Sequence, residues 1–139
     1  MSEMLEKILS DDNIENAYKR VYANKGAGGV DGVTINELEE YMKEHWKGIK
    51  EEIRERKYKP QPVLRVEIPK PNGGMRKLGI PTVIDRVIEQ AITQVLTPIF
   101  EPIFSESSYG FRPNRSCEQA IIKLLEYFND GYVWIVDID

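Results

Sequence analysis

Residues 63–80 read VLRVEIPKPNGGMRKLGI, and this stretch decides the fold of the chain. Apolar and charged residues alternate over residues 63–68, which is typical of a β-strand with one exposed face. The PNGG sequence that follows Lys70 is a strong turn signal, and the MRKLGI sequence after it reads as a returning strand. The stretch therefore predicts a β-hairpin with Lys70 and Arg76 on either side of its tip.

The segments before the hairpin read as helices. Apolar residues recur at helical spacing over residues 3–9 and again over residues 11–22. A third helix is expected over residues 34–56, where Thr34 and Glu37 have the spacing of a capping box.

Beyond the hairpin, residues 81–97 predict a long apolar helix that Pro98 ends. Residues 105–114 read as a loop, and Ser116 with Gln119 forms a capping box that opens a last helix.

Residues 132–138 are a nearly continuous apolar run, which suits a fully buried central strand with Trp134 in the core. A central strand needs a neighbour on each side, and the only other clear strands belong to the hairpin. We therefore expect an α+β chain that is part of a larger unit, cut just after a buried strand.

The composition is that of an ordinary globular chain and excludes several kinds of site. Hydrophobic residues make up 41% and charged residues 30% of the 139 residues. No run of about 18 apolar residues and no secretory signal is recognisable, so we expect a cytoplasmic protein without a membrane span. One cysteine and one histidine exclude an internal disulfide, a multi-cysteine zinc site and a cluster of histidine ligands.

The net charge of −4 hides a basic segment in the middle of the chain. Residues 53–77 carry 8 basic and 2 acidic side chains, whereas residues 1–52 carry 7 and 12, and residues 78–139 carry 4 and 9. Screening limits the reach of exposed charges to roughly 10 Å, so phosphate binding depends on local charge. The segment is either a phosphate-binding surface or a solvated basic face.

Two carboxylates stand at the end of the apolar run. Asp137 and Asp139 are alternate residues, and alternate residues of a strand point to the same face. Mg²⁺ prefers such oxygen ligands, and polymerases use two such ions in phosphoryl transfer. The alternative is a strand end that simply reaches water.

The hairpin tip and the loop before the last helix are the other candidates. Lys70 and Arg76 suit a clamp for a triphosphate, or else they are solubilising charges at an exposed turn. In the YGFRPNRS sequence of residues 109–116, Arg112 and Arg115 are candidates for nucleic-acid contacts, because arginines bind phosphates and helix N-termini favour anions. The aromatic residues of this loop, Tyr109 and Phe111, are expected in the core.

Four sequence patterns in a fixed order resemble group II intron-encoded reverse transcriptases, also called maturases. The patterns are NKGAGGVDG at 24–32, IPKPNGGMRKLGIP at 68–81 followed by DR at 85–86, YGFRPNRS at 109–116, and VDID at 136–139. The resemblance implies reverse-transcriptase fingers with a β-hairpin packed on helices, plus the first palm strand. It divides the chain into an N-terminal extension with the glycine-rich loop (1–34), the fingers (35–131) and the truncated first palm strand (132–139).

The resemblance also implies a role for each part. Lys70 and Arg76 lie where the incoming nucleoside triphosphate binds, and Ile80 and Arg86 join this nucleotide-binding set near the templating base. Asp139 is the catalytic and metal-binding aspartate of the first palm strand. The residues expected to bind RNA come from the extension, the hairpin and the 109–116 loop: Asn24, Lys25, Arg65, Lys77, Arg112 and Arg115.

The sequence ends at Asp139, before the Tyr-x-Asp-Asp hairpin that supplies the family's other metal ligands. We therefore expect Mg²⁺, intron and template RNA, primer DNA and dNTP to be used by the complete enzyme, and these 139 residues alone to be inactive. The alternative is a non-catalytic RNA-binding or self-associating module, in which a homodimer covers an exposed strand edge. A metabolic enzyme with a nucleotide loop is disfavoured because no Walker motif follows the glycines.

Overall fold

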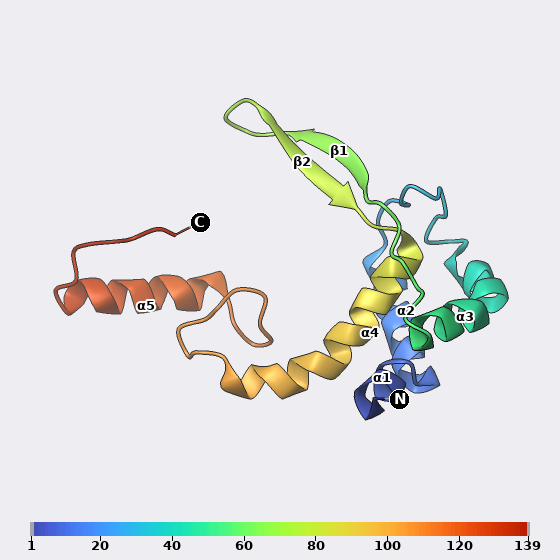
Figure 1. The fold of residues 1–139 in the computed structure, drawn as a ribbon. Coiled ribbons are helices and arrows are strands. Elements are labelled where there is room, and N and C mark those ends of the chain that lie inside the picture. The colour runs from blue at the N-terminus through green and yellow to red at the C-terminus, as the bar shows by residue number, and fades with distance from the viewer. Residues whose placement is uncertain (1, 139) are drawn as a thin grey trace. The chain divides into compact units, whose positions relative to one another are not determined.

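The computed structural model describes residues 2–138 and divides into two compact units, one up to Thr97 and one from Pro98. The first unit contains α1 (Glu3–Ile8), α2 (Asp11–Asn24), α3 (Leu38–Arg54), β1 (Leu64–Pro69), β2 (Met75–Ile80) and most of α4 (Val83–Phe100) (Figure 1). The second contains the end of α4, a 3₁₀ turn η1 (Glu101–Ile103) and α5 (Cys117–Asn129). The functional division at residues 34 and 131 stays a prediction.

The core of the first unit is formed by α2, α3 and α4. Ala17 on α2, Leu38 on α3, and Val83, Val87 and Ala91 on α4 are fully buried. The three α4 residues follow one another at intervals of four, which places them on one face of the helix. The apolar stripe predicted for this helix is therefore confirmed.

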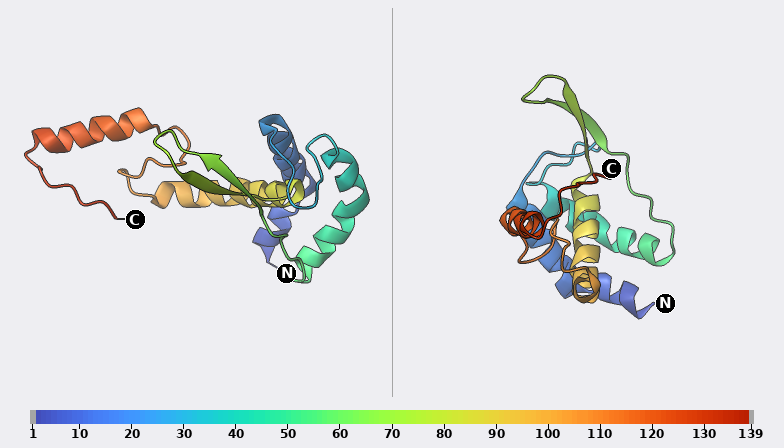
Figure 2. Two further views of the ribbon diagram at one scale, coloured as in Figure 1. Left: turned by 90° about the horizontal axis from the view of Figure 1, so that it is seen from above. Right: turned by 90° about the vertical axis from the view of Figure 1, so that its left-hand side faces the viewer.

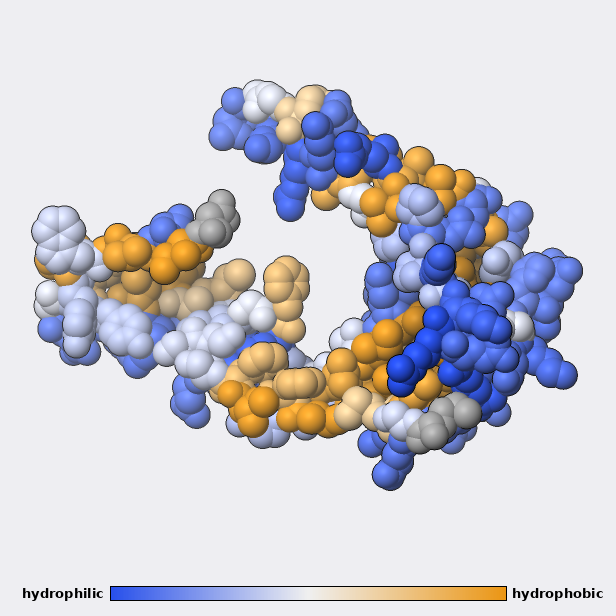
Figure 3. All heavy atoms as spheres, viewed as in Figure 1, coloured by the Kyte–Doolittle hydropathy of each residue, from blue (hydrophilic) through white to orange (hydrophobic). Residues whose placement is uncertain are grey.

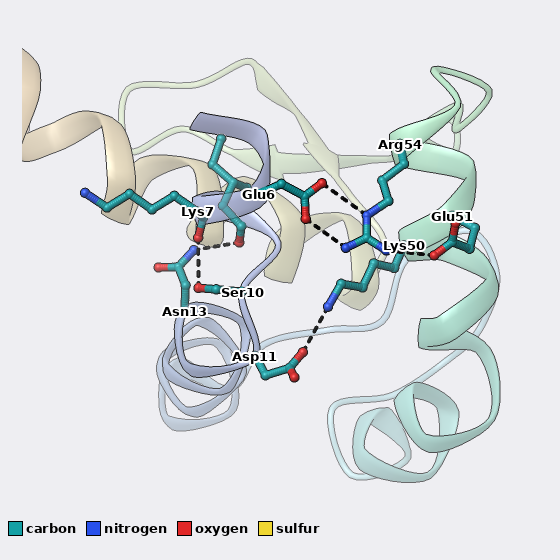
Figure 4. Close-up of polar contacts among 9 residues, drawn as sticks. Glu6, Lys7, Ser10, Asp11, Asn13, Lys50, Glu51 and Arg54 are labelled. Atoms are coloured by element: carbon teal, nitrogen blue, oxygen red, sulfur yellow. Dashed lines mark hydrogen bonds and ion pairs between the residues drawn. The ribbon is translucent and has the colours of Figure 1, made fainter. Parts of the chain in front are cut away.

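Ion pairs fasten α1 and α2 to α3 (Figure 4). Arg54 donates from Nε and Nη2 to the carboxylate of Glu6, at 3.2 and 2.8 Å, and from Nη1 to Glu51 at 2.8 Å. Lys50 Nζ lies 2.9 Å from Asp11 Oδ1. The hydrogen bond from Arg54 lowers the pKa of Glu6 below its ordinary value, so this pair is charged at neutral pH.

The start of α3 differs from the prediction. Glu37 Oε2 accepts hydrogen bonds from the backbone N (2.9 Å) and the hydroxyl (2.6 Å) of Thr34. The hydroxyl therefore donates to the glutamate instead of accepting from the backbone, and only half of the expected capping box forms. Residues 35–37 make a turn, α3 begins at Leu38, and it continues without a break through Gly48.

The end of α4 also differs, because Pro98 lies inside the helix and α4 runs on to Phe100. Proline removes one backbone hydrogen bond and crowds the preceding turn. Pro98 lies two residues before the last residue of α4, where that loss is tolerated, and the chain continues directly into η1.

The hairpin matches its prediction closely. Its two strands pair antiparallel in a register that runs from Leu64 opposite Ile80 to Pro69 opposite Met75. It extends away from the helices of the first unit in Figures 1 and 2. Most of its residues are exposed.

The predicted start of α5 is confirmed. Ser116 Oγ accepts from Gln119 N at 3.4 Å, and Gln119 Oε1 accepts from Ser116 N at 3.0 Å, which is the reciprocal capping box.

The strand predicted over residues 132–138 is absent, which corrects the sequence analysis. This segment is irregular, and Trp134, which we expected in the core, is 92% exposed. A strand is held by hydrogen bonds to its neighbours, and within residues 2–138 the only paired strands are β1 and β2. The described chain is therefore an α+β structure of helices and one hairpin, without the first palm strand.

Apolar side chains are also exposed on α5, including Ile121, Ile122 and Leu125. Figure 3 shows hydrophobic atoms at the surface of this helix and of the chain that follows it. None of the helices within residues 2–138 has both the length and the apolar character needed to cross a membrane.

Candidate functional site

The tip of the hairpin holds Lys70 and Arg76 on either side of a four-residue turn. Lys70 N donates to Gly74 O at 3.0 Å, and Gly73 N donates to Lys70 O at 3.2 Å. Gly73 and Gly74 have φ angles of 85° and 83°, a region that favours glycine. Both cations are exposed, and the convergence of their side chains at the tip stays a prediction.

The register assigns the basic residues of the hairpin to two faces. Arg76 is paired with Ile68 and Ile80 with Leu64, so Arg76 and Ile80 lie on one face. The alternate residues of each strand point to the other face, which holds Arg65 and Lys77. The hairpin residues expected to bind nucleotide and those expected to bind RNA are thus on opposite faces.

The glycine-rich loop after α2 is anchored to α4 by Arg86. Its guanidinium donates from Nη2 to Ala27 O at 2.5 Å and from Nη1 to Lys25 O at 3.5 Å. Asn24, Lys25 and Arg86 line one cavity of about 260 Å³, together with residues of α2 and α4. The fold therefore brings together two residues expected to bind RNA and one expected to bind nucleotide.

Asp85 is a buried acid whose role the sequence analysis did not identify. Its carboxylate accepts hydrogen bonds from Tyr58 and Thr82 side chains and from the backbone of Gln61. Burial, and then the hydrogen bond to Asp85, raise the pKa of Tyr58 well above its ordinary value. The Thr82-x-x-Asp85 spacing is a capping signal that could have drawn attention to this acid, but no local pattern predicts Tyr58 as its partner.

In the second unit, Arg112 organises the loop in which it lies. Its guanidinium bonds the Glu101 carboxylate, at 2.8 Å from Nη2, and donates from Nη1 to Ser105 O (2.7 Å) and Ser108 O (2.9 Å). Its side chain is only 8% exposed. These contacts occupy the guanidinium within the loop, while its expected contact with RNA stays a prediction.

The other residues of this loop are more open. Arg115 Nη1 donates to Glu106 O at 3.2 Å, and its guanidinium lies 5.5 Å from the centre of the Tyr109 ring. Phe111, expected in the core, is fully exposed at a φ of 55°. The expectation was wrong because the described part of this unit provides a single long helix and no second layer to cover the ring.

Asp139 lies outside the described residues, so its place in a site stays a prediction. Asp137 is exposed. Within residues 2–138, no three residues among His, Cys, Asp and Glu are grouped as a metal site requires.

The family model described as "Reverse transcriptase (RNA-dependent DNA polymerase)" matches residues 68–139, which include the end of β1, β2, α4, α5 and the segment after it. The chain belongs to the reverse transcriptase family. This reverse transcriptase chain is 38% identical over 133 residues to the group II intron-encoded protein LtrA of Lactococcus lactis, covering 95% of this chain and 22% of LtrA. It is 37% identical over 145 residues to protein YkfC of Escherichia coli, covering 100% of this chain and 38% of YkfC.

The match to LtrA, together with the family model, confirms the resemblance to group II intron-encoded reverse transcriptases. The reverse transcriptase chain spans about a fifth of the length of LtrA. A solved Cas6-RT-Cas1–Cas2 complex matches 99% of this chain and 14% of the solved chain, with a TM-score of 0.59 and 22% identity. That likeness supports the fold of helices plus a hairpin.

Proposed function

We propose that the chain forms the fingers of a group II intron-type RNA-directed DNA polymerase, whose hairpin binds the incoming dNTP. The observation that carries this proposal is the tip geometry of Lys70 and Arg76. Two backbone hydrogen bonds close the turn between them, so both side chains start from fixed positions. Cations carried on such a backbone can meet the charge that develops during phosphoryl transfer.

The two faces of the hairpin support a simultaneous contact with RNA. Arg65 and Lys77 lie on the face opposite Arg76 and Ile80. An RNA phosphate on one face would therefore not compete with a nucleotide on the other. Asn24 and Lys25, beside Arg86, would extend the RNA contact from the hairpin to the glycine-rich loop, and Arg112 and Arg115 would add a contact from the second unit.

The complete enzyme in this proposal uses Mg²⁺, intron and template RNA, primer DNA and dNTP in the cytoplasm. Asp139 would supply one catalytic carboxylate from the palm part that starts at residue 132, after the extension (1–34) and the fingers (35–131). One such carboxylate cannot hold two metal ions, so residues 1–139 alone are expected to be inactive.

The test is nucleotide incorporation by a complete reverse transcriptase, made by joining residues 1–139 to the remainder of LtrA. Lys70→Ala and Arg76→Ala each remove a charged contact to the triphosphate. Each is expected to raise KM for dNTP by about tenfold or more, because a hydrogen bond to a charged group contributes about 1.5–3 kcal/mol.

Arg20→Ala and Lys47→Ala are matched controls, because both remove an exposed positive charge from the helices of the same unit. They should leave KM unchanged. Unchanged nucleotide incorporation by the Lys70 and Arg76 variants contradicts the clamp role, and primer extension by residues 1–139 alone contradicts the proposed division of the active site.

The second candidate function is a non-catalytic RNA-binding or self-associating module. The exposed apolar side chains of α5 and residues 132–138 favour it, because such a surface invites association with another chain. In this case sedimentation of residues 1–139 should show a homodimer, and Lys70→Ala should weaken RNA binding without changing nucleotide incorporation.

A further inference from the structure

The Asp85 carboxylate is buried and makes three hydrogen bonds as an acceptor. The residue is only 4% exposed. Its Oδ1 accepts from the Tyr58 hydroxyl at 2.6 Å, and its Oδ2 accepts from the Thr82 hydroxyl at 2.7 Å and from Gln61 N at 3.1 Å. A buried carboxylate is tolerated because these bonds replace its contacts with water.

The donors to Asp85 come from both ends of the hairpin. Tyr58 and Gln61 belong to the segment that leads into β1, and Gln61 lies three residues before the first residue of that strand. Thr82 lies two residues after the end of β2. One carboxylate at the start of α4 therefore joins the chain that enters the hairpin to the chain that leaves it.

Capping of α4 does not account for this arrangement. The contact needed for capping is the local one, in which Asp85 N donates to Thr82 Oγ1 at 3.2 Å. Tyr58 and Gln61 are 27 and 24 residues away in sequence, and neither is required to start a helix. Their contacts with Asp85 instead hold the segment that leads into β1 against the start of α4.

The root of the hairpin controls where its tip points. The two strands pair only with each other among the described residues, so no third strand fixes their direction. Six residues at about 3.3 Å each make a lever of roughly 20 Å, and a change of about 10° at the root displaces the tip by roughly 3 Å. A shift of that size is enough to separate a cation from a phosphate.

We propose that Asp85 is a positioning residue that fixes the direction of the hairpin, and thereby the place of Lys70 and Arg76 relative to the first unit. The structural part of this inference stands on the contacts of Asp85 alone. Its consequence for nucleotide binding rests on the function proposed above.

The direction of the hairpin can be measured in the 139-residue chain with spin labels. Cys117→Ser removes the native thiol, and labels on Asn72→Cys at the turn and Arg20→Cys on α2 report the distance from tip to helix. Asp85→Ala should broaden the distance distribution by about twofold or more, because the root loses all three bonds. Tyr58→Phe should broaden it less, since it removes a single bond.

Two further variants act as controls. Asp85→Asn should keep a narrow distribution, because its amide oxygen can accept from Gln61 N and Thr82 while its amide nitrogen donates to the Tyr58 oxygen. Tyr22→Phe makes the same chemical change as Tyr58→Phe at a tyrosine on α2, and it should have no effect. If Asp85→Ala does not fold, Tyr58→Phe still tests whether the contacts of Asp85 fix the direction of the hairpin. A distribution unchanged by Tyr58→Phe, or changed equally by Tyr22→Phe, overturns the proposal.

The consequence for nucleotide binding is tested in the complete reverse transcriptase described above. Asp85→Ala and Tyr58→Phe should raise KM for dNTP and also weaken the binding of primer–template, because Arg65 and Lys77 move with the hairpin. Asp85→Asn should restore both. Unchanged KM in these variants overturns the positioning role if Lys70→Ala does raise KM. If Lys70→Ala leaves KM unchanged, the proposed function fails, and the distance distribution alone decides whether Asp85 fixes the hairpin.

Discussion

Two glycines of the first unit differ in the space that surrounds them. A Cβ built on Gly29 would lie 2.6 Å from Thr82 Cα and 2.7 Å from Thr82 N, so the glycine-rich loop approaches the start of α4 backbone to backbone. A Cβ on Gly48, inside α3, would have nothing within 4 Å. Glycine is required at the first position for space, whereas at the second it only adds flexibility to the unfolded chain.

Alanine should therefore act with opposite sign at these two glycines. Gly29→Ala is expected to destabilise the fold by about 1–3 kcal/mol, because backbone atoms must move apart. Gly48→Ala is expected to stabilise it by about 0.5–1 kcal/mol, because alanine favours a helix interior. Urea denaturation gives both free energies of unfolding, and a Gly29→Ala variant as stable as the parent would show that the loop does not pack on α4.

The same glycine-rich loop shows how far a residue pattern can predict structure. Its four glycines correctly predict a segment that is not helical. They do not predict that Arg86, 59 residues from Ala27 in sequence, holds the loop in place. Contacts of this kind depend on the packing of α2 against α4, which no local pattern encodes.

At the scale of single elements, two serines allow the contribution of a side-chain cap to helix stability to be measured. Ser116 precedes α5 and forms a capping box, whereas Ser10 precedes α2 without any side-chain cap bond. The two sites have the same residue type and similar extended backbone, with ψ angles of 163° and 145°. They differ in φ, which is −141° at Ser116 and −64° at Ser10, and in the role of the hydroxyl. Ser116 Oγ accepts from the first turn of α5, whereas Ser10 Oγ donates to Lys7 O at 2.9 Å, before α2 begins.

Ser116→Ala should destabilise α5 by about 1 kcal/mol, because a backbone N–H at the helix start loses its acceptor. The loss should appear as lower helix content in the carbon chemical shifts of residues 117–129. Ser10→Ala is the control and should change the shifts of α2 much less. Equal losses in the two helices would mean that the hydroxyl bond at Ser116 contributes nothing.

The elements that the sequence predicts well are those held by local contacts. The hairpin and α5 follow from a glycine turn and a capping box, and both appear where expected. The run over residues 132–138 failed as a strand because strand formation needs a hydrogen-bonded neighbour, which a local pattern cannot supply. Pro98 failed as a helix stop because the loss of its backbone bond and the crowding of the preceding turn are tolerated so near the end of α4.

At the scale of the whole molecule, the positions of site residues also differ in whether they depend on local or on distant contacts. The local turn puts Lys70 and Arg76 on either side of the hairpin tip, and the strand register puts Arg65 and Lys77 on the face opposite Arg76. The binding roles of these residues stay predictions. Asp85 escaped notice because its partner Tyr58 is 27 residues away. The place of Asp139 is still a prediction, because that residue lies beyond the described part of the chain.

The distribution of charge leads to a prediction for RNA binding. The chain has a net charge of −4, yet residues 53–77 carry 8 basic and 2 acidic side chains. The acidic remainder should repel RNA at a distance, so affinity must come from a few phosphate contacts within the basic segment. Such contacts release counterions, and their number can be read from the salt dependence of binding.

Arg65→Ala combined with Lys77→Ala should make this salt dependence shallower. Each phosphate contact of a single strand contributes about −0.7 to the slope of log K against log salt, so losing two should change the slope by about 1.4. Fluorescence anisotropy of a labelled RNA gives the slopes, and Arg20→Ala combined with Lys47→Ala is the matched control with the same loss of charge. If both pairs shift the slope equally, RNA responds only to the overall charge of the chain, and the hairpin face has no special role in binding it.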